Sequence, residues 1–453
     1  MTEGTLCPAI AMNRMIEPDR DGPPVGLSEH RICVAIVAAN ASARASGEAM
    51  LPLQYFRWLR RRGVNAYLIV HSRTRDELEA TFPADRDRIF AVPDTWLHQQ
   101  MSRIGGWLPD RIAMITTGWL VQLSTEAAQR RVIRQLVRER AVNLVHQPVP
   151  VSPRMPSFLY DLGVPVVIGP MNGGMTYPPG FRNLENKLER YLIAFGRWSA
   201  GFVNWLLPGK RKAALLLVAN DRTREALPPG ACRNVEELLD NGVDLDLWGR
   251  ADAVNPRRKE QLRLAFIGRL IPWKGVDLLL EAIASMANQI PVRLDIIGRG
   301  YEREKLEELV QKLNLRDYVV FHGYVEQERS RDLLAQCDAL VLPSLYECGG
   351  AVVLEAMAMS KPVIATRWGG PVDYLDTATG ILIEPHSRNA MIMQIADAIK
   401  QLNGNPERFK KMGAAARAKV ERYFSWSSKI EHLIPLYESC LGEGKRSAVR
   451  GDR

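Results

Sequence analysis

The sequence is poor in the residues that cross-link small folds or hold metals in them. Of its 453 residues, six are cysteine and seven are histidine. The cysteines are scattered, with no Cys-x-x-Cys pair and no Cys/His cluster among Cys7, Cys33, Cys232, Cys337, Cys348 and Cys440. This spacing argues against a disulfide framework and a structural zinc site, and it favours a reducing compartment.

Long hydrophobic runs are also missing. No run of about 18 uncharged apolar residues occurs, and the nearest, residues 191–207, is interrupted by Arg197. The first 30 residues contain no apolar stretch of the kind that signal peptides carry. We therefore expect a cytoplasmic protein that does not span a membrane.

Charge is plentiful, with 60 Lys and Arg residues against 51 Asp and Glu residues, a net charge of +9. Basic side chains cluster at residues 57–62 and 210–212. Such clusters suit an anionic partner, whether a nucleotide, a lipid headgroup or a nucleic acid, although solubility alone accounts equally well for scattered charges.

Apolar runs of strand length alternate with helical patterns along most of the chain. This alternation predicts α/β architecture, with two doubly wound domains separated near the polar segment 250–260. Residues 96–140 show a less regular pattern. The expected strands are 32–38, 66–70, 143–145, 164–168 and 215–219, then 262–267, 292–297, 319–321, 339–342 and 363–365. Ligands of such folds bind beyond the carboxyl ends of the strands, so we expect the site in a cleft that the two domains face.

The first candidate site segment follows the expected strand 262–267. Arg269 and Lys274 precede a helix there, and Gly268 and Gly275 allow close approach of the backbone. Two cations in such a loop can neutralise a diphosphate leaving group, Arg with a planar fork and Lys as a point charge.

The second candidate segment follows the expected strand 339–342. Gly349 and Gly350 open a helix whose first amides favour an anionic or hydroxyl-rich ligand. Glu347 lies in the loop before this helix and Glu355 lies inside it among apolar residues. Two carboxylates beside a strand end are good acceptors for sugar hydroxyls. A helix cap and a solvated glutamate are the alternatives.

These segments together resemble the retaining glycosyltransferases of family 4, which have the GT-B fold. The resemblance is carried by Gly268-Arg269 with Lys274-Gly275, by Glu347-x7-Glu355, and by residues 361–366 with Gly369-Gly370-Pro371. It extends back to residues 241–244 and forward to residues 424–426. It implies a domain at 30–250 that binds the acceptor, a domain at 251–425 that binds the donor, and a helix at 426–442 that crosses back to the first domain. Residues 1–29 and 443–453 are expected to be mobile tails.

The resemblance also implies roles for individual residues. Arg269 and Lys274 would hold the donor diphosphate in place of a metal, so no metal and no cofactor are expected. Glu355 would accept from the ribose hydroxyls and Glu347 from the donor sugar, with the amides of Gly349 and Gly350 close by. Many members read Glu-Gly-Phe-Gly where this chain has Glu347-Cys348-Gly349-Gly350, so the chain departs from the family pattern at the expected sugar contacts. The base would be read around Arg299 and residues 321–324.

The first domain offers further candidates. His146 ends the strand 143–145, where the family often places a histidine that touches the donor sugar. Asn172 and Gly173 lie in a glycine-rich loop after another strand, and Gly47 and Glu48 open the first helix. We expect these four residues to contact the acceptor. The aspartate pairs at 85/87 and 244/246 match the Asp-x-Asp string that can hold a metal, but they lie in a polar loop and in the expected linker.

The resulting prediction is a hexosyltransferase that moves a sugar from GDP-mannose or UDP-glucose to a glycan or polyprenyl-diphosphate-linked acceptor in surface or exopolysaccharide synthesis. Residues 57–62 and 191–212, with Trp198 and Trp205, would form a basic, aromatic face against the inner leaflet. A sugar-nucleotide epimerase of the same architecture is the first alternative. A non-catalytic basic nucleotide or nucleic-acid binder is the second, although no nucleic-acid-binding motif is found.

Overall fold

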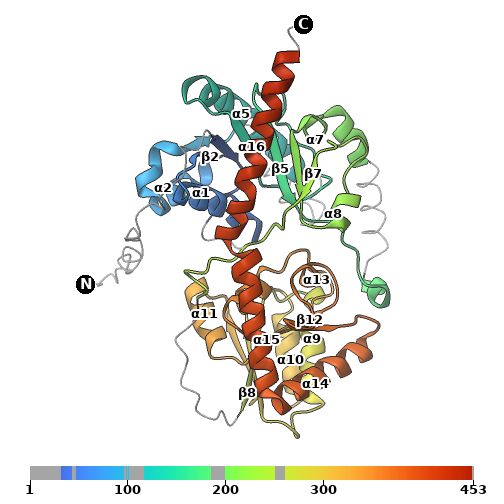
Figure 1. Cartoon of the computed structure of the whole chain (residues 1–453). Coiled ribbons are helices and arrows are strands. Elements are labelled where there is room, and N and C mark those ends of the chain that lie inside the picture. The colour runs from blue at the N-terminus through green and yellow to red at the C-terminus, as the bar shows by residue number, and fades with distance from the viewer. Residues whose placement is uncertain are drawn as a thin grey trace, which may run out of the picture. The chain divides into compact units, whose positions relative to one another are not determined.

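Two parallel β-sheets form the framework of the computed structural model (Figure 1). It describes residues 32–42, 47–95, 98, 100–101, 117–184, 199–249 and 261–450, the last eight by backbone alone. The first sheet has seven strands in the order β3-β2-β1-β4-β5-β6-β7. Its strands are β1 Cys33–Val37, β2 Asn65–His71, β3 Ile89–Val92, β4 Leu144–Gln147, β5 Val166–Met171, β6 Leu215–Val218 and β7 Val235–Glu237.

The second sheet has six strands in the order β10-β9-β8-β11-β12-β13. Its strands are β8 Leu262–Ile267, β9 Val292–Ile297, β10 Val319–Gly323, β11 Ala339–Leu342, β12 Val363–Thr366 and β13 Gly380–Ile383. The pairings within both sheets are parallel, so each sheet has one edge where all its strands end. The strand order reverses beside β1 in the first sheet and beside β8 in the second, which is the doubly wound arrangement that the alternating pattern predicted.

Helices connect successive strands in both domains. Those of the first domain are α1 Leu51–Arg61, α2 Arg75–Thr81, α5 Thr117–Glu139, α7 Gly209–Lys212 and α8 Asp221–Glu225, with short helices η2 Gly47–Met50 and η5 Pro179–Leu184. Those of the second are η6 Pro272–Lys274, α9 Val276–Ala284, α10 Arg303–Lys312, α11 Gln327–Ala335, α12 Ala351–Ala358, α13 Gly370–Tyr374, α14 Arg388–Gly404 and α15 Pro406–Lys419. The chain then passes through η7 Val420–Phe424 into α16 Trp426–Arg450.

Alternate residues of β1 show why the first sheet is covered on both faces. Val34 and Ile36 pack in one apolar cluster with α1, and Cys33, Ala35 and Val37 pack in another with α5. Because successive side chains of a strand point to opposite faces, a strand that is apolar at every position needs cover on both sides. The continuous apolar runs of the sequence therefore mark buried parallel strands.

The predicted strands all appear, within a few residues of their expected ends. Three others were missed, because each carries a weak signal: β3 has four residues, β7 is largely exposed, and β13 begins at a glycine. The segment 96–140 was expected to be irregular, but its second half forms the long helix α5. Apolar and charged residues are mixed along α5, which hides the helical period in the sequence.

The last helix returns to the first domain, as the resemblance implied. Trp426, Ile430, Leu433 and Tyr437 of α16 belong to the apolar cluster that contains β1 and α1. The helix runs to Arg450, so it is longer than the predicted 426–442 and includes most of the segment expected to be a tail. At the point of crossing, Val243 pairs with Ser425 in a parallel β-bridge, which ties the two passages of the chain together.

A loop of the first domain also packs into the second. Tyr177 and Phe181 belong to the apolar cluster built on β8 and β11, and the indole N–H of Trp368 donates to the carbonyl of Thr176 at 2.8 Å. A side chain at Gly180 would collide with the carbonyl of His386. Among the described residues, no helix combines the length and apolar character needed to span a bilayer.

Candidate functional site

The loop that follows β8 places the two predicted cations at the carboxyl edge of the second sheet. Arg269 is exposed, and no described residue forms an ion pair with it. The loop lies against the next one along the edge, since Gly298 has φ +144° and a side chain there would collide with the carbonyl of Gly268. Leu270 N–H donates to the Arg299 carbonyl at 3.0 Å. Glycine at 298 therefore lets the two loops meet.

Lys274 and Glu347 are brought together from different strands. The Lys274 ammonium donates to the Glu347 carboxylate in a short ion pair, and both side chains are 13% exposed. Glu347 is held in turn by its own backbone, whose carbonyl accepts from Gly370 N–H at 2.8 Å. The sequence assigned both residues to the donor site, and the structure places them side by side at the sheet edge.

Glu355 lies one helical turn inside α12 and is the unusual carboxylate of this edge. It is half-buried, and none of the described residues donates a hydrogen bond to it or pairs with it. Burial raises the pKa of Glu355 to about 7. A carboxyl group held without a partner in apolar surroundings is costly to ionise, and such groups are often found where a ligand supplies the missing donors.

The structure also explains the Cys348-Gly349-Gly350 departure from the family pattern. A Cβ at Gly349 would come too close to the amide nitrogen of the Asn241 side chain, so that side chain would have to move. Gly350 has φ +79° and caps α12 in the left-handed region, where glycine is favoured. Glycine at 350 is therefore favoured by the backbone conformation, whereas a side chain at 349 depends on movement of Asn241.

Glu48 has a partner within its own domain. Its Oε1 accepts from the backbone N–H of Val151 at 2.8 Å, and burial raises the pKa of its carboxyl. Gly47 has φ +73°, is exposed, and begins η2 just before Glu48. Glu48 thus anchors the loop after β4, and no described residue donates to its other carboxylate oxygen.

His146 does not lie where the resemblance implied. The ring is completely buried, and both nitrogens are engaged: Nε2–H donates to the Gly169 carbonyl at 2.6 Å, and Nδ1 accepts from the Tyr437 hydroxyl at 2.7 Å. Burial lowers the pKa of His146 to about 4, so the ring is neutral. The structure therefore does not support the predicted contact of His146 with the donor sugar, because the ring has no exposed atom and both of its nitrogens are hydrogen-bonded.

We expect Tyr437→Phe to lower the free energy of unfolding by about 1–2 kcal/mol, because it leaves Nδ1 of His146 buried without a donor. Equilibrium unfolding in urea at pH 7 measures this. Tyr423→Phe is the matched control, since Tyr423 is half exposed and its hydroxyl has no such role. Equal stabilities of the two variants would contradict the role given to the Tyr437–His146 bond.

Asn172 and Gly173 also differ from their predicted role as acceptor contacts. The Asn172 amide donates to Asp240 Oδ1 at 2.9 Å and to the Cys348 carbonyl at 3.0 Å, and its oxygen accepts from Arg222. Gly173 N–H donates to Thr223, and its carbonyl accepts from Arg222 Nε at 3.0 Å. The Asn172 side chain has its donors and acceptor in use, so it serves other residues and not a ligand.

Two charged residues behind this loop were missed by the sequence analysis. Lys429 of α16 is buried, donates to the backbone carbonyl of Asp240, and lies over the Trp426 ring at 4.6 Å. Burial lowers the pKa of Lys429 to about 7, and the nearby Asp240 opposes that shift. Lys429 and Asp240 meet only because α16 packs against the segment that contains Asp240. The two residues are far apart in the sequence, so no local pattern predicts their contact.

The predicted basic face on α1 is largely neutralised. Its arginines pair with carboxylates of other segments: Arg57 with Asp244, Arg60 with Asp85, Arg61 with Asp246, and Arg62 with Glu431. Three of these carboxylates are the Asp-x-Asp aspartates. The arginines of α1 thus hold the linker and α16, and the expectation that residues 57–62 present free charge to a membrane is wrong.

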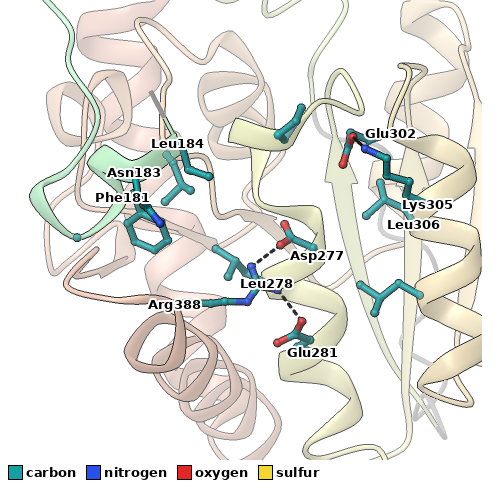
Figure 2. Close-up of a pocket in the computed structure, with 14 residues that line it drawn as sticks. Phe181, Asn183, Leu184, Asp277, Leu278, Glu281, Glu302, Lys305, Leu306 and Arg388 are labelled. Atoms are coloured by element: carbon teal, nitrogen blue, oxygen red, sulfur yellow. Dashed lines mark hydrogen bonds and ion pairs between the residues drawn. The ribbon is translucent and has the colours of Figure 1, made fainter. Parts of the chain in front are cut away.

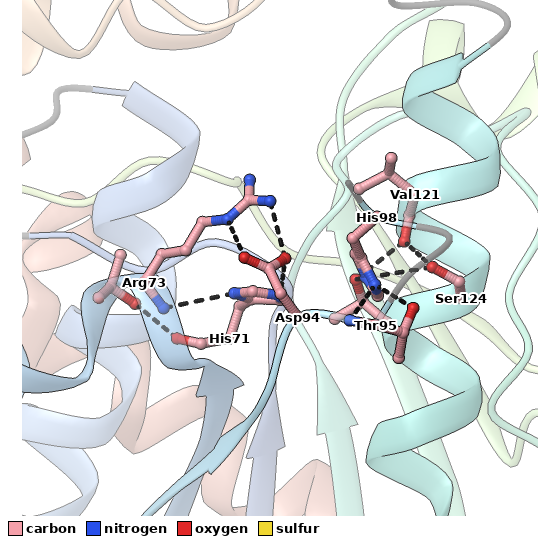
Figure 3. Close-up of polar contacts among 9 residues, drawn as sticks. His71, Arg73, Asp94, Thr95, His98, Val121 and Ser124 are labelled. Atoms are coloured by element: carbon pink, nitrogen blue, oxygen red, sulfur yellow. Dashed lines mark hydrogen bonds and ion pairs between the residues drawn. The ribbon is translucent and has the colours of Figure 1, made fainter. Parts of the chain in front are cut away.

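A cluster on the first domain has the composition of a metal site but the wrong protonation (Figure 3). Ligand atoms of His71, Asp94 and His98 lie within 4.8 Å of one another at the carboxyl ends of β2 and β3. Nδ1 of His71 accepts from the Arg73 amide at 3.3 Å, and Nδ1 of His98 accepts from the Thr95 amide at 3.1 Å. Each Nε2 must then carry the proton, so neither ring offers Nε2 as a ligand. The cluster is a hydrogen-bond network that fastens this edge to α5.

A separate pocket of about 490 Å³ lies beside the donor loops (Figure 2). Its floor is apolar, with Leu278, Leu306 and Leu345, and η5 forms one wall. Arg388 bridges Asp277 and Glu281 at 2.5 and 2.6 Å, so its charges are already paired. Lys274, Glu347 and Glu355 are not among the residues that line this pocket.

Two Rossmann-like domains, joined by a linker and a returning helix, define the GT-B fold of glycosyltransferases. Solved structures share this fold. Anabaena HepE in complex with UDP superposes with a TM-score of 0.61 at 16% identity, covering 90% of this chain and all of that one. Sucrose-phosphate synthase from Thermosynechococcus elongatus does so with a TM-score of 0.61 at 19% identity, covering 91% and 100%.

Sequence comparison matches part of the chain to a described family. Residues 250–419 match the family described as "Glycosyl transferases group 1". D-inositol 3-phosphate glycosyltransferase of Streptomyces scabiei is 32% identical over 227 residues, 46% of this chain and 50% of the relative. Alpha-D-kanosaminyltransferase of Streptomyces kanamyceticus is 29% identical over 238 residues, 50% and 61%. The chain spans about half the length of the curated relatives it matches.

Proposed function

We propose that the protein is a retaining glycosyltransferase that moves a hexosyl group from a nucleoside-diphosphate sugar to a hydroxyl of a glycan or polyprenyl-diphosphate-linked acceptor. The observation that carries the proposal is one arrangement at the carboxyl edge of the second sheet. There the unpaired cation Arg269 and the Lys274–Glu347 pair come from the loops after β8 and β11, and the unpartnered Glu355 comes from α12. Such a set offers positive charge to a diphosphate and acceptors to hydroxyl groups.

The main chemical task of the enzyme in this reaction is to stabilise the negative charge that develops on the leaving group. As the anomeric bond breaks, the nucleoside diphosphate gains negative charge, which Arg269 and Lys274 stabilise at the bridging and terminal phosphate oxygens. Glu347 keeps the Lys274 ammonium at the sheet edge before the donor arrives. This role makes a divalent metal unnecessary for the step, and we propose that the enzyme works without one.

The stereochemical course is proposed as retention. The incoming hydroxyl attacks on the face from which the diphosphate leaves, and a phosphate oxygen takes its proton. The C–O bond to the leaving group breaks, the new glycosidic C–O bond forms, and the nucleoside diphosphate departs with the proton. His146 has no part in this scheme, since its ring is enclosed.

The base is proposed to lie beside Arg299, at the ends of β9 and β10. Two exposed aromatic side chains stand there, Tyr301 and Tyr324, and the Arg299 guanidinium lies 5.1 Å from the Tyr324 ring centre. Aromatic faces accept any base by stacking. The choice between guanine and uracil would then fall to backbone groups of residues 298–300 and 322–324.

Several comparisons support the class of substrate. One Anabaena HepE structure contains UDP and another contains UDP and glucose. By name, one relative is a D-inositol 3-phosphate glycosyltransferase and another is a kanosaminyltransferase. Synthesis of a surface or exopolysaccharide is our proposed setting.

A thermal-shift panel with GDP, UDP, ADP and dTDP and their sugar conjugates tests the proposal. A ligand at about 100 times its Kd stabilises the native state by roughly 2.7 kcal/mol, so one nucleotide series should raise the melting temperature clearly. Absence of a shift with the whole panel would contradict the proposal. Formation of the 2-epimer of a shifting donor, with no transfer, would favour the epimerase instead.

The membrane surface is proposed on part of the predicted segment 191–212, without residues 57–62. Residues 199–206 are helical, and Phe202, Trp205 and Leu206 are each more than 60% exposed, with the Phe202 and Trp205 rings stacked at 5.9 Å. Arg211 is exposed nearby in the chain, although Lys210 is buried and Lys212 pairs with Asp161. Trp198 lies outside the described residues. Exposed aromatic residues beside a cation suit the headgroup region of an anionic bilayer.

We expect Trp205→Ser to weaken binding to vesicles of phosphatidylglycerol and phosphatidylcholine by about tenfold or more, because a large apolar side chain no longer enters the bilayer interface. Co-sedimentation measures the binding. Tyr423→Ser, which removes an exposed aromatic side chain from another segment, is the control and should bind as the wild type does. Equal vesicle binding by the wild type and both variants would contradict the proposed membrane surface.

A further inference from the structure

The loop 347–350 carries the donor-site carboxylate, yet few backbone bonds hold it. Three of its carbonyls accept hydrogen bonds: that of Glu347 from Gly370 N–H, that of Cys348 from the Asn172 side chain at 3.0 Å, and that of Gly350 from Val353 N–H. The second of these donors comes from the other domain. The position of Glu347 therefore depends in part on Asn172, which lies in the loop after β5.

Asn172 is itself fixed from three directions. Its backbone N–H donates to the Val151 carbonyl at 2.8 Å, its side-chain amide donates to Asp240 Oδ1 at 2.9 Å, and its side-chain oxygen accepts from Arg222 Nη2 at 3.2 Å. The side chain is buried, at 3% exposure. A buried amide with all its donors and its acceptor in use is rigid, and its loss leaves several groups unpaired.

Asp240 links this amide to the linker and to α16. Burial raises the pKa of the Asp240 carboxyl, and the nearby Lys429 opposes that shift. Lys429 also donates to the backbone carbonyl of Asp240. The chain of contacts runs from α16 through Asp240 and Asn172 to the carbonyl of Cys348.

We propose that Asn172 is a positioning residue for the donor. It donates both to Asp240 and to the Cys348 carbonyl, and it thereby holds the loop 347–350 in the conformation that receives the sugar. Both hydrogen bonds can form only while Asp240 and Cys348 lie next to Asn172 at the same time. The donor part of this inference rests on the proposed function. The anchoring of the loop by Asn172 does not depend on it.

The variants separate hydrogen bonding from space filling. Asn172→Ala removes the amide. Asn172→Asp keeps the shape but turns a carboxylate toward Asp240 and toward the Cys348 carbonyl, which both need a donor. The exchange Asn172→Asp with Asp240→Asn restores a donor–acceptor pair between these two positions, whereas the Cys348 carbonyl still has none.

The first readout is the alkylation rate of Cys348 by iodoacetamide, followed by peptide mass mapping. Cys348 is partly exposed, and burial raises the pKa of its thiol to about 11, so the native loop should react slowly. The second readout is the Kd of whichever nucleotide sugar stabilises the wild type, measured by calorimetry. Circular dichroism melting checks that each variant folds.

We expect Asn172→Ala to raise both the alkylation rate and the donor Kd by about tenfold, the effect of one buried group left unpaired. Asn172→Asp should be at least as severe. The exchanged pair should regain the melting temperature but keep fast alkylation and weak donor binding. Wild-type behaviour of Asn172→Asp in both readouts, or full recovery of both by the exchanged pair, would overturn the inference. If no nucleotide sugar binds the wild type, the proposed function fails while the alkylation result still decides whether Asn172 anchors the loop.

Discussion

Replacement of Lys274 by alanine should reduce turnover by about 10²–10³-fold, equivalent to roughly 3–4 kcal/mol of transition-state stabilisation. The physical reason is the charge that develops on the leaving diphosphate, which Lys274 meets as a point charge at the carboxyl edge of the second sheet. Its loss also frees Glu347, which pairs with no other cation among the described residues. The measurement is release of nucleoside diphosphate under single-turnover conditions, with the donor in excess of its Kd.

Lys212→Ala is the matched control for this variant. It too removes a lysine from an ion pair, with Asp161 at 2.6 Å, but the pair lies on the surface of the first domain. Its rate should stay within about twofold of the wild type, because exposed pairs of this kind contribute little. If Lys274→Ala turns over at the wild-type rate, the claim that this edge of the second sheet stabilises the charge of the leaving diphosphate is contradicted.

Donor affinity should fall as the pH drops below about 7, and Glu355→Gln should abolish this dependence while binding weakly at every pH. The pKa of Glu355 is raised by burial to about 7, so the carboxylate that accepts from ribose hydroxyls is lost below that pH. Each further pH unit should raise the donor Kd up to about tenfold. Calorimetric titration between pH 5.5 and 8 measures this.

The same shift has the opposite consequence for the free protein. A carboxyl whose pKa is higher in the folded than in the unfolded state favours folding while it is protonated, and this contribution is lost as the pH rises from about 4.5 to about 7. Glu355→Gln should therefore stabilise the ligand-free protein at pH 8, by on the order of 2 kcal/mol. Glu438→Gln, an exposed change on α16, is the control and should alter neither stability nor donor binding. A pH-independent donor Kd in the wild type would contradict the role of Glu355.

The elements of the second domain could be predicted well, because its strands are apolar on both faces and are punctuated by glycine. Leu262–Ile267 and Ala339–Leu342 read as continuous apolar runs, and the charged residues that follow them fall at one edge by the geometry of parallel strands. Lys274 and Glu347 are far apart in the sequence, yet this rule places them together. The unpartnered state of Glu355 could not be predicted, since it depends on what surrounds α12 in three dimensions.

The first domain shows the limit of the same reasoning. His146 stands at a strand end, as a catalytic histidine would, and only the packing of Tyr437 from α16 reveals that its ring is closed off. Asn172 stands in a glycine-rich loop, as a ligand contact would, and only the approach of Asp240 and Cys348 reveals that its amide is in use. Both corrections come from partners distant in the sequence, whose positions no local pattern specifies.

The prediction of a basic surface at residues 57–62 fails for a related reason. Four positive charges in six residues predict a basic surface, because the sequence contains no record of which acids they meet. The structure supplies one carboxylate for each of Arg57, Arg60, Arg61 and Arg62. Exposed apolar residues near Trp205 then remain as the better indication of a membrane surface.

A crystal structure with the nucleotide sugar that gives the largest thermal shift tests the central claim most directly. The account predicts the diphosphate on Arg269 and Lys274 and the ribose hydroxyls within hydrogen-bond distance of Glu355. It also predicts the sugar against the loop 347–350, with Asn172 still bonded to the Cys348 carbonyl. A nucleotide bound elsewhere, such as in the pocket lined by Leu278 and Arg388, with Glu355 left without a partner, would contradict it.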